Sequence, residues 1–159
     1  MASSYGFPQD TYFYIKSVKT GLVLDVFDGQ MGDDACIITW PQKMNDNDNQ
    51  LWSFENGFLT NYKSKRVLDI RGGDLKSDCA VVQYAKKSTK VHNQRFGFRD
   101  GYIYVISEPR LVFDIKGGSD KQGTGLIVYK KKTHGHENQQ WELEPFEQPH
   151  RFKNPFGHA

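Results

Sequence analysis

The sequence predicts an all-β domain made of three copies of one folding unit, and three observations lead there. A set of spaced residues occurs three times with the same internal spacing. Aromatic residues make up 14% of the chain and glycine is frequent, which suits short strands joined by tight turns. The repeated set reads Asp25, Gly29, Trp40, Lys43, Asn49, Gln50 and Trp52, then Asp69, Gly73, Tyr84, Lys87, Asn93, Gln94 and Phe96, and then Asp114, Gly118, Tyr129, Lys132, Asn138, Gln139 and Trp141.

Length and charge narrow the class of protein. A chain of 159 residues is long enough for one domain with one sizeable core. The net charge of +2, from 21 basic and 19 acidic residues, gives no support for nucleic acid as a partner. No stretch approaches the roughly 20 apolar residues of a membrane span, and the first ten residues lack the pattern of a secretory signal. We therefore expect a cytoplasmic protein that does not insert into membranes, with any release following an unconventional route.

Each copy contains about four segments that are predicted to be strands. In the first copy these are residues 12–17, 22–26, 37–40 and 50–54, which are rich in aromatic and branched side chains and are separated by polar or glycine-containing turns. The second copy repeats them at 58–62, 66–70, 80–84 and 94–98. The third repeats them at 102–106, 111–115, 126–130 and 139–143, with one extra residue before its Asp.

A closed threefold β structure accounts best for these repeats. Three propeller blades would be too few for the usual ring of about four to eight, whereas closure would pair most strand edges. We expect an N-terminal arm over residues 1–11, a body over 12–146 with lobes of about 12–55, 56–99 and 100–146, and a C-terminal tail over 147–159.

Part of the repeated set is interpreted as structural. Gln50, Gln94 and Gln139 stand two places before Trp52, Phe96 and Trp141. Strand alternation would put amide and ring on the same side, with the ring in the core and the amide bonding buried backbone groups. The glycines at 29, 73 and 118 are expected in turns that need positive φ.

The Asp, the aromatic, the Lys and the Asn form a second group that points to a ligand. Asp25, Asp69 and Asp114 lie within apolar segments that are predicted to be strands. Burying an ionised carboxylate there costs free energy unless hydrogen-bond donors meet it. Backbone amides of the following loop are one possible set of donors. Sugar hydroxyls are the other, with the aromatic ring stacking on the C–H face of the sugar, the Asn amide donating and accepting, and the Lys donating.

Catalysis and metal binding find little support. A glycosidase needs two carboxylates per site, and only one recurs. No serine or cysteine triad recurs, and His134 with His136 is weak as a metal motif. We expect no enzyme activity, metal or cofactor. Cys36 and Cys79 stand in different copies and are expected to be free, mostly buried thiols, in keeping with a reducing compartment.

Three copies of Gln-x-aromatic, in register with the Asp and the Asn-Gln pair, resemble the ricin B-chain type lectins, also called the QxW family. The likeness covers residues 12–146 and is greatest to the earthworm-type galactose-binding lectins and to single-domain fungal lectins. It implies a β-trefoil of twelve strands, in which three hairpins close a six-stranded barrel, with one shallow sugar site in each lobe.

The resemblance assigns four residues to each site. They are Asp25, Trp40, Lys43 and Asn49 in the α lobe, Asp69, Tyr84, Lys87 and Asn93 in the β lobe, and Asp114, Tyr129, Lys132 and Asn138 in the γ lobe. Many relatives carry a Gln two residues before the ring, where this chain has Ile38, Val82 and Ile127; in earthworm-like members the Lys contributes instead.

The resemblance implies a non-enzymatic lectin, a multivalent one with up to three sites, that binds galactose or N-acetylgalactosamine on glycoproteins or glycolipids, in a defensive role and as a monomer or homodimer. Two alternatives stay open from the residues. One is a protein-interaction module, such as a protease inhibitor or cytoskeletal binder. The other is an acidic-glycan binder that uses the lysine clusters at 86, 87 and 90 and at 130–132.

Overall fold

The structure is a computed structural model that describes residues 4–147. Within this range the chain forms twelve β-strands and five short 3-10 turns, with no α-helix. None of its helical turns is long and apolar enough to span a membrane. The expected tail falls outside the described residues apart from Glu147.

Each expected lobe contains four strands. The first has β1 (Phe13–Ser17), β2 (Val23–Val26), β3 (Ile37–Trp40) and β4 (Trp52–Glu55). The second has β5 (Phe58–Asn61), β6 (Val67–Ile70), β7 (Cys79–Tyr84) and β8 (Phe96–Arg99). The third has β9 (Tyr102–Val105), β10 (Glu108–Ile115), β11 (Leu126–Lys130) and β12 (Trp141–Pro145). The extra residue of the third copy coincides with a register shift between β9 and β10, from Glu108 to Val112.

Pairing divides the strands of each lobe into two groups. The first and fourth strands build the barrel, because β1 pairs with β12 and β4, β4 with β5, and β8 with β9, all antiparallel. The second and third strands form one hairpin per lobe, namely β2–β3, β6–β7 and β10–β11. This is the arrangement of a β-trefoil, and it confirms the expected fold.

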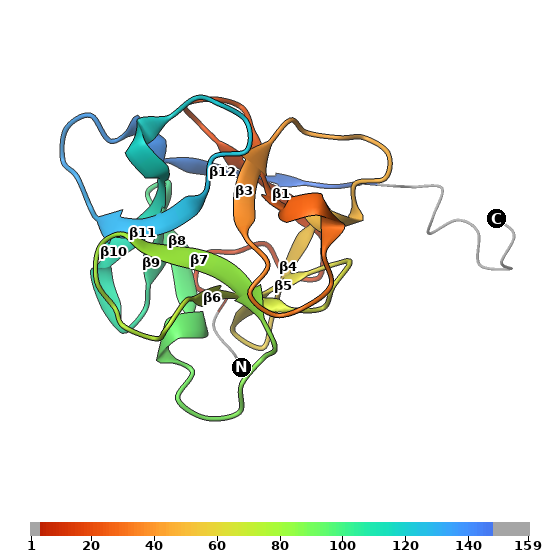
Figure 1. Ribbon diagram of the computed structural model, residues 1–159, viewed down its shortest axis with the longest axis horizontal. Helices are drawn as coiled ribbons and strands as arrows, with labels where there is room; N and C mark the ends of the chain where they lie inside the picture. Colours follow the sequence, from red (N-terminus) through yellow and green to blue (C-terminus); the bar gives the residue numbers. More distant parts are fainter. Residues whose placement is uncertain (1–3, 148–159) are drawn as a thin grey trace, which may run out of the picture.

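The three hairpins meet around a pseudo-threefold axis. Figure 1 shows β3, β7 and β11 enclosing the centre of the molecule, each contributed by a different lobe. Short antiparallel contacts join them in a ring: Ile38 lies opposite Gly125, Ile127 opposite Ala80, and Cys36 opposite Val82. Equivalent sites on the three hairpins therefore face outward in three directions.

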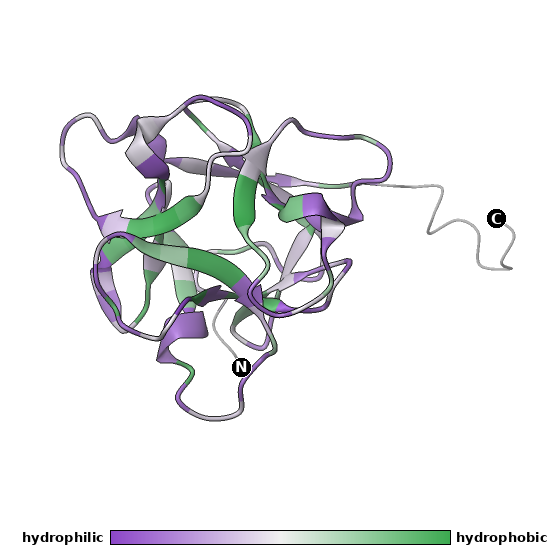
Figure 2. Ribbon diagram, viewed as in Figure 1, coloured by the Kyte–Doolittle hydropathy of each residue, from purple (hydrophilic) through white to green (hydrophobic). Residues whose placement is uncertain are grey.

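A main core fills the space between barrel and hairpins, and a small second cluster of Tyr14, Val23 and Leu51 lies apart from it. Figure 2 shows apolar residues concentrated on the strands and polar residues on the surrounding loops. The rings of the Gln-x-aromatic motifs lie in this core as expected, with Trp52 and Phe96 at 0% and Trp141 at 2% exposure. The two indole N–H groups donate to Leu24 O and Phe113 O at 3.2 and 3.3 Å.

Part of the expected N-terminal arm belongs to the body. Phe7 is 3% exposed, and its ring stacks on Phe54 with centroids 4.8 Å apart. It also meets Phe13 and Phe98, which belong to β1 and β8. The chain is fixed here by Phe98 N–H, which donates to Tyr5 O at 2.7 Å. Residues 4–7 thus complete one end of the core. The sequence did not predict this packing, because the segment is short and polar and has no periodic pattern.

The motif glutamines are not strand residues, so the prediction that amide and ring share one side of a strand is wrong. Gln50, Gln94 and Gln139 end the 3-10 turns η2 (Asp48–Gln50), η3 (His92–Gln94) and η5 (Glu137–Gln139). Their N–H groups donate to the carbonyls three residues earlier, each at 2.8 Å. The turn sends each amide toward the lobe's Asp, while the ring enters the core.

The cysteines are free, but the expectation that they are mostly buried is wrong. Cys36 is exposed and Cys79 is half-buried. Cys36 immediately precedes Ile37, whose side chain is 1% exposed, and alternation along an extended chain turns the thiol outward. Cys79 opens β7 at the edge of the core, against which it packs partly.

Candidate functional site

Each candidate site begins with an aspartate in the second strand of its lobe. Asp25, Asp69 and Asp114 are 3%, 4% and 3% exposed. Across their hairpins they lie opposite Ile38, Val82 and Ile127. The strand after each Asp enters a turn in which Gly29, Gly73 and Gly118 have φ of 60°, 77° and 64°, as the sequence predicts.

Side-chain amides, and not loop backbone, supply the donors to the Asp25 carboxylate. Gln50 Nε2 donates to Asp25 Oδ2 at 3.0 Å, and Asn49 Nδ2 donates to Asp25 Oδ1 at 3.2 Å. Gln50 also satisfies backbone groups, because its Nε2 donates to Pro41 O and its Oε1 accepts from Lys43 N–H, both at 2.9 Å. A buried amide therefore connects the carboxylate to the loop that carries Lys43.

The other two lobes repeat the glutamine bonds of this network, whereas the bond from asparagine to aspartate recurs only in the γ lobe among the described residues. Gln94 Nε2 donates to Asp69 Oδ2, and Gln139 Nε2 donates to Asp114 Oδ2, both at 2.9 Å. The backbone N–H groups of Lys87 and Lys132 donate to the two Gln Oε1 atoms at 3.1 and 2.9 Å. Sequence reasoning gave these glutamines a purely structural role, whereas they also hold the site carboxylates.

The site asparagines use their N–H groups within the protein. Asn49 Nδ2 donates to Val26 O at 3.0 Å in addition to Asp25. Asn93 and Asn138 bond Ile70 O and Ile115 O in the same way. The Nδ2 groups of Asn49 and Asn138 each make two such bonds, and that of Asn93 makes one. Asn93 Oδ1 accepts from Lys87 Nζ at 2.7 Å, and Asn138 Oδ1 accepts from Lys132 Nζ at 3.3 Å.

Burial sets the electrostatics of the carboxylates. It raises the pKa of Asp25, Asp69 and Asp114 above the ordinary value, because the charged form loses hydration. The hydrogen bonds from the Gln amides and the positive charges of Lys43, Lys87 and Lys132 oppose that rise in pKa. Each carboxylate is thus a partly desolvated acceptor beside a cation.

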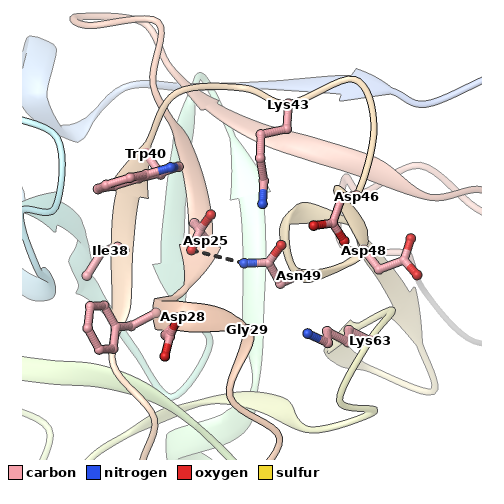
Figure 3. Close-up of a pocket in the computed structure, with 11 residues that line it drawn as sticks. Asp25, Asp28, Gly29, Ile38, Trp40, Lys43, Asp46, Asp48, Asn49 and Lys63 are labelled. Atoms are coloured by element: carbon pink, nitrogen blue, oxygen red, sulfur yellow. Dashed lines mark hydrogen bonds between the residues drawn. The ribbon is translucent and has the colours of Figure 1, made fainter.

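The α-lobe residues surround a cavity of about 360 Å³, within the usual size of a small-molecule site of about 300–1,000 Å³. Figure 3 shows Trp40 and Ile38 along one wall, with Asp25 and Asn49 at the centre and Lys43 above them. Asp46, Asp48 and Lys63 stand on the opposite side. All four residues predicted for this site line the cavity, and Trp40 is half-buried, which leaves ring surface for a ligand.

The β-lobe residues also line one depression. Asp69, Tyr84, Lys87 and Asn93 share it with Asp34, Arg71, Gly72 and Gly73. Tyr84 is 36% exposed. Asp34 belongs to the first lobe, and its carboxylate lies 3.8 Å from Arg71 Nε.

The γ-lobe residues are assembled by direct contacts. Asn138 Nδ2 donates to Asp114 Oδ1 at 3.2 Å, and Lys132 Nζ lies 5.9 Å from the centroid of the Tyr129 ring. The structure therefore brings all four predicted residues together in this lobe as well.

Lysines from neighbouring lobes reach two of the candidate sites, which the sequence did not indicate. Lys63, in the turn between β5 and β6, lines the α cavity, and a Cβ on Gly29 would lie 2.5 Å from its Nζ. Lys19, in the equivalent turn between β1 and β2, donates to Gly118 O in the γ lobe. The spacing from Lys19 to Asp25 equals that from Lys63 to Asp69, but repeat spacing alone does not show which site a turn reaches.

A trefoil with one Asp–aromatic–Lys–Asn cluster per lobe is the architecture of a carbohydrate-binding module of the ricin type. The family profile for the ricin-type beta-trefoil lectin domain matches residues 11–141. The chain belongs to this family.

Two solved structures show the likeness in three dimensions. The C-half of the earthworm R-type lectin, solved in complex with GalNAc, has a TM-score of 0.74 at 24% identity, covering 86% of this chain and 99% of that one. ThreeFoil, a designed 3-fold symmetric protein, has a TM-score of 0.73 at 25% identity, covering 86% and 100%. The second likeness reflects the repeat of one unit about the axis.

A local match relates the chain to Mucoricin of Rhizopus delemar. The two are 52% identical over 58 residues, which is 36% of this chain and 40% of Mucoricin. The matched stretch thus spans well under half of that relative.

Proposed function

We propose that this protein is a non-enzymatic lectin that binds galactose or N-acetylgalactosamine on glycans through up to three shallow sites. The observation that carries the proposal is the threefold occurrence of one cluster: a buried carboxylate held by the amide of the motif glutamine, beside an asparagine, an accessible aromatic ring and a lysine. Family membership and the GalNAc complex of the earthworm lectin support it.

The chemistry of the cluster suits a sugar with an axial and an equatorial hydroxyl side by side. A fixed carboxylate accepts from two hydroxyls at once, and the Lys ammonium donates to one of them. The opposite face of galactose is a patch of C–H groups that fits a tryptophan or tyrosine ring. Binding needs no covalent step, so the site requires no second carboxylate acting as acid or nucleophile.

The further acidic residues that line the α cavity do not favour hydrolysis. Asp28, Asp46 and Asp48 lie near Asp25, but the place of Asp28 is taken by Gly72 and Gly117 in the other lobes. Asp25 itself has both oxygens bonded to amides. We expect no release of nitrophenol from nitrophenyl galactosides.

Several sites on one molecule compensate for weak single sites. A shallow site with one stacking ring binds a monosaccharide at about millimolar strength, or about 4 kcal/mol. Linked sites raise the apparent affinity by about 10² or more where they engage one surface together.

Capture on galactose-coated beads tests the proposal. Replacing Trp40, Tyr84 and Tyr129 with Ala one at a time should weaken capture stepwise, because each replacement removes one stacking surface while the core rings stay in place. Free galactose should elute the parent and free glucose should not. A folded triple variant that is captured like the parent would overturn the site assignment in favour of a protein-interaction module.

Salt distinguishes the acidic-glycan alternative. Adding about 0.5 M salt screens capture that depends on exposed lysines far more than capture by stacking and short hydrogen bonds. We expect galactose-dependent capture to persist. Since both thiols are free, we further propose a reducing compartment, the cytoplasm, as the place of action.

A further inference from the structure

One of the positions at which the three sites differ lies two residues after the site aspartate. Phe27 occupies it in the α lobe, where it begins η1 (Phe27–Gly29), whereas Arg71 and Lys116 occupy it in the other lobes. Phe27 is 50% exposed and lines the α cavity. The repeat therefore places an apolar ring where its two other copies place a cation.

Phe27 extends an apolar wall that is already present. Ile38 and Trp40 line the same cavity, and Figure 3 shows both on the side facing away from Asp46, Asp48 and Lys63. The α cavity thus has hydroxyl partners on one side and apolar surface on the other, next to the stacking ring, with Asp28 at the edge of the apolar surface.

The backbone holds Phe27 at the surface. Its N–H donates to Cys36 O at 3.0 Å, and its carbonyl accepts from Gln30 N–H at 3.1 Å. The next residue, Asp28, has φ of 55°, which fixes the turn further. A phenyl ring that is half-exposed and cannot turn into the core gains by contacting an apolar group of a ligand.

We infer that Phe27 and Ile38 form an apolar subsite of the α site, which takes an apolar group attached to the bound galactose. This inference rests on the proposed function. The group is one joined to the sugar through its glycosidic oxygen and presenting C–H or ring surface, such as a phenyl aglycone. Arg71 and Lys116 give the β and γ sites no equivalent surface, so the preference belongs to the α lobe.

The tryptophans allow the α site to be observed alone. The chain has 3 of them, and Trp52 and Trp141 are buried with their indole N–H groups bonded to backbone carbonyls. Only the indole N–H signal of Trp40 belongs to a sugar site, so its shift in a ¹H–¹⁵N spectrum reports occupancy of the α site. Methyl β-galactoside and phenyl β-galactoside are titrated separately.

The expected result is that the phenyl compound binds the parent about five-fold more tightly than the methyl compound, as burial of part of a phenyl ring implies. In Phe27→Arg, which installs the residue of the second lobe, the ratio of the two dissociation constants should fall toward one. Met31→Arg is the matched control: Met31 is 54% exposed on the same loop but does not line the cavity, and its ratio should equal that of the parent.

Three outcomes would count against the inference in different ways. Equal affinities of the parent for both compounds would overturn the subsite while leaving the galactose site in place. If Phe27→Arg still binds phenyl β-galactoside more tightly than methyl β-galactoside by the same factor as the parent, other residues cause the preference and the role of Phe27 is overturned. Absence of any Trp40 shift with methyl β-galactoside would instead overturn the proposed sugar site in this lobe.

Discussion

The side chain of Gln50 donates to the carboxylate of Asp25 at 3.0 Å, although the two residues lie on different elements, η2 and β2. Gln50 is fully buried, and it also bonds the carbonyl of Pro41 and the N–H of Lys43. One amide thus couples the stability of the lobe to the orientation of the group that would meet the ligand. The pairs Gln94–Asp69 and Gln139–Asp114 repeat this relationship.

Replacing Gln50 with Ala is expected to lower both stability and α-site affinity. The change leaves buried partners without hydrogen bonds, which costs about 1–3 kcal/mol in the free energy of unfolding. Urea unfolding measures the first effect and the Trp40 indole titration the second. Gln140→Ala is the control, because within residues 4–147 its amide bonds just the exposed carbonyl of Asp100. An equal loss in both variants would show that Gln50 has no special role.

Galactose binding is expected to fall on acidification before the fold is lost. Burial raises the pKa of Asp25, Asp69 and Asp114 above 3.8, so these groups take up protons at a pH where ordinary aspartates are still ionised, and a protonated group accepts hydroxyls poorly. Protonation of groups whose pKa is raised in the folded state does not destabilise the fold relative to the unfolded chain, because the native state binds those protons more readily.

The fold should instead lose stability at lower pH. The Lys16 ammonium and the Gln42 amide hold the pKa of Glu144 below 4.5, and stability from such a group disappears as the pH falls through its folded value. Bead capture and near-ultraviolet circular dichroism, followed together from about pH 7 to about pH 4, should separate, with capture lost first. Simultaneous loss would contradict the prediction.

Phe7 is expected to contribute strongly to stability despite its place near the chain start. Truncating a fully buried phenylalanine costs about 3–5 kcal/mol, and Phe7 contacts three rings from two lobes. Phe7→Ala should therefore shift the urea midpoint markedly. Gln9→Ala, an exposed change in the same segment, should leave the midpoint where it is; a small effect of Phe7→Ala would mean that residues 4–7 do not pack on the barrel in solution.

Two free thiols per chain are expected on denatured, non-reduced protein. On the native protein Cys36 should react with a thiol reagent faster than Cys79, because Cys36 is exposed and Cys79 is half-buried. Counting with the parent and with Cys36→Ser assigns the rates. Finding no free thiol would contradict both the structure and the reducing compartment.

The repeat predicted the strands and the composition of the sites because each depends on residues within one lobe. Asp25, Trp40, Lys43 and Asn49 recur at fixed intervals, and a closed threefold fold must treat equivalent residues alike. The role of Gln50 could be predicted only in part. Its burial followed from the motif, but the direction of its side chain depends on the 3-10 turn that it ends. The sequence pattern placed Gln50 in the following strand, and an error of one residue at an element boundary is enough to hide such a turn.

Residues specific to one lobe could not be found from the repeat. Phe27 and Asp46 have no counterpart of the same kind in the other copies, so a search for recurrence passes over them. Lys63 recurs as Lys19, but the site that each lysine reaches depends on how neighbouring lobes pack. The spacing of residues along the chain carries no information about that packing. Phe7 was missed because a single buried ring in a polar segment leaves no periodic pattern.

The lysines that cross lobe boundaries limit how modular the repeat is. Lys63 reaches the α cavity from the second lobe, and Lys19 of the first lobe reaches Gly118 of the third. An excised first or third lobe would carry its own Asp, ring, Lys and Asn yet lack its neighbour's lysine, so the α and γ sites that we propose each need a pair of adjacent lobes. Shuffling lobes in an engineered binder would therefore change the chemistry of a site without altering any residue of the lobe that holds it.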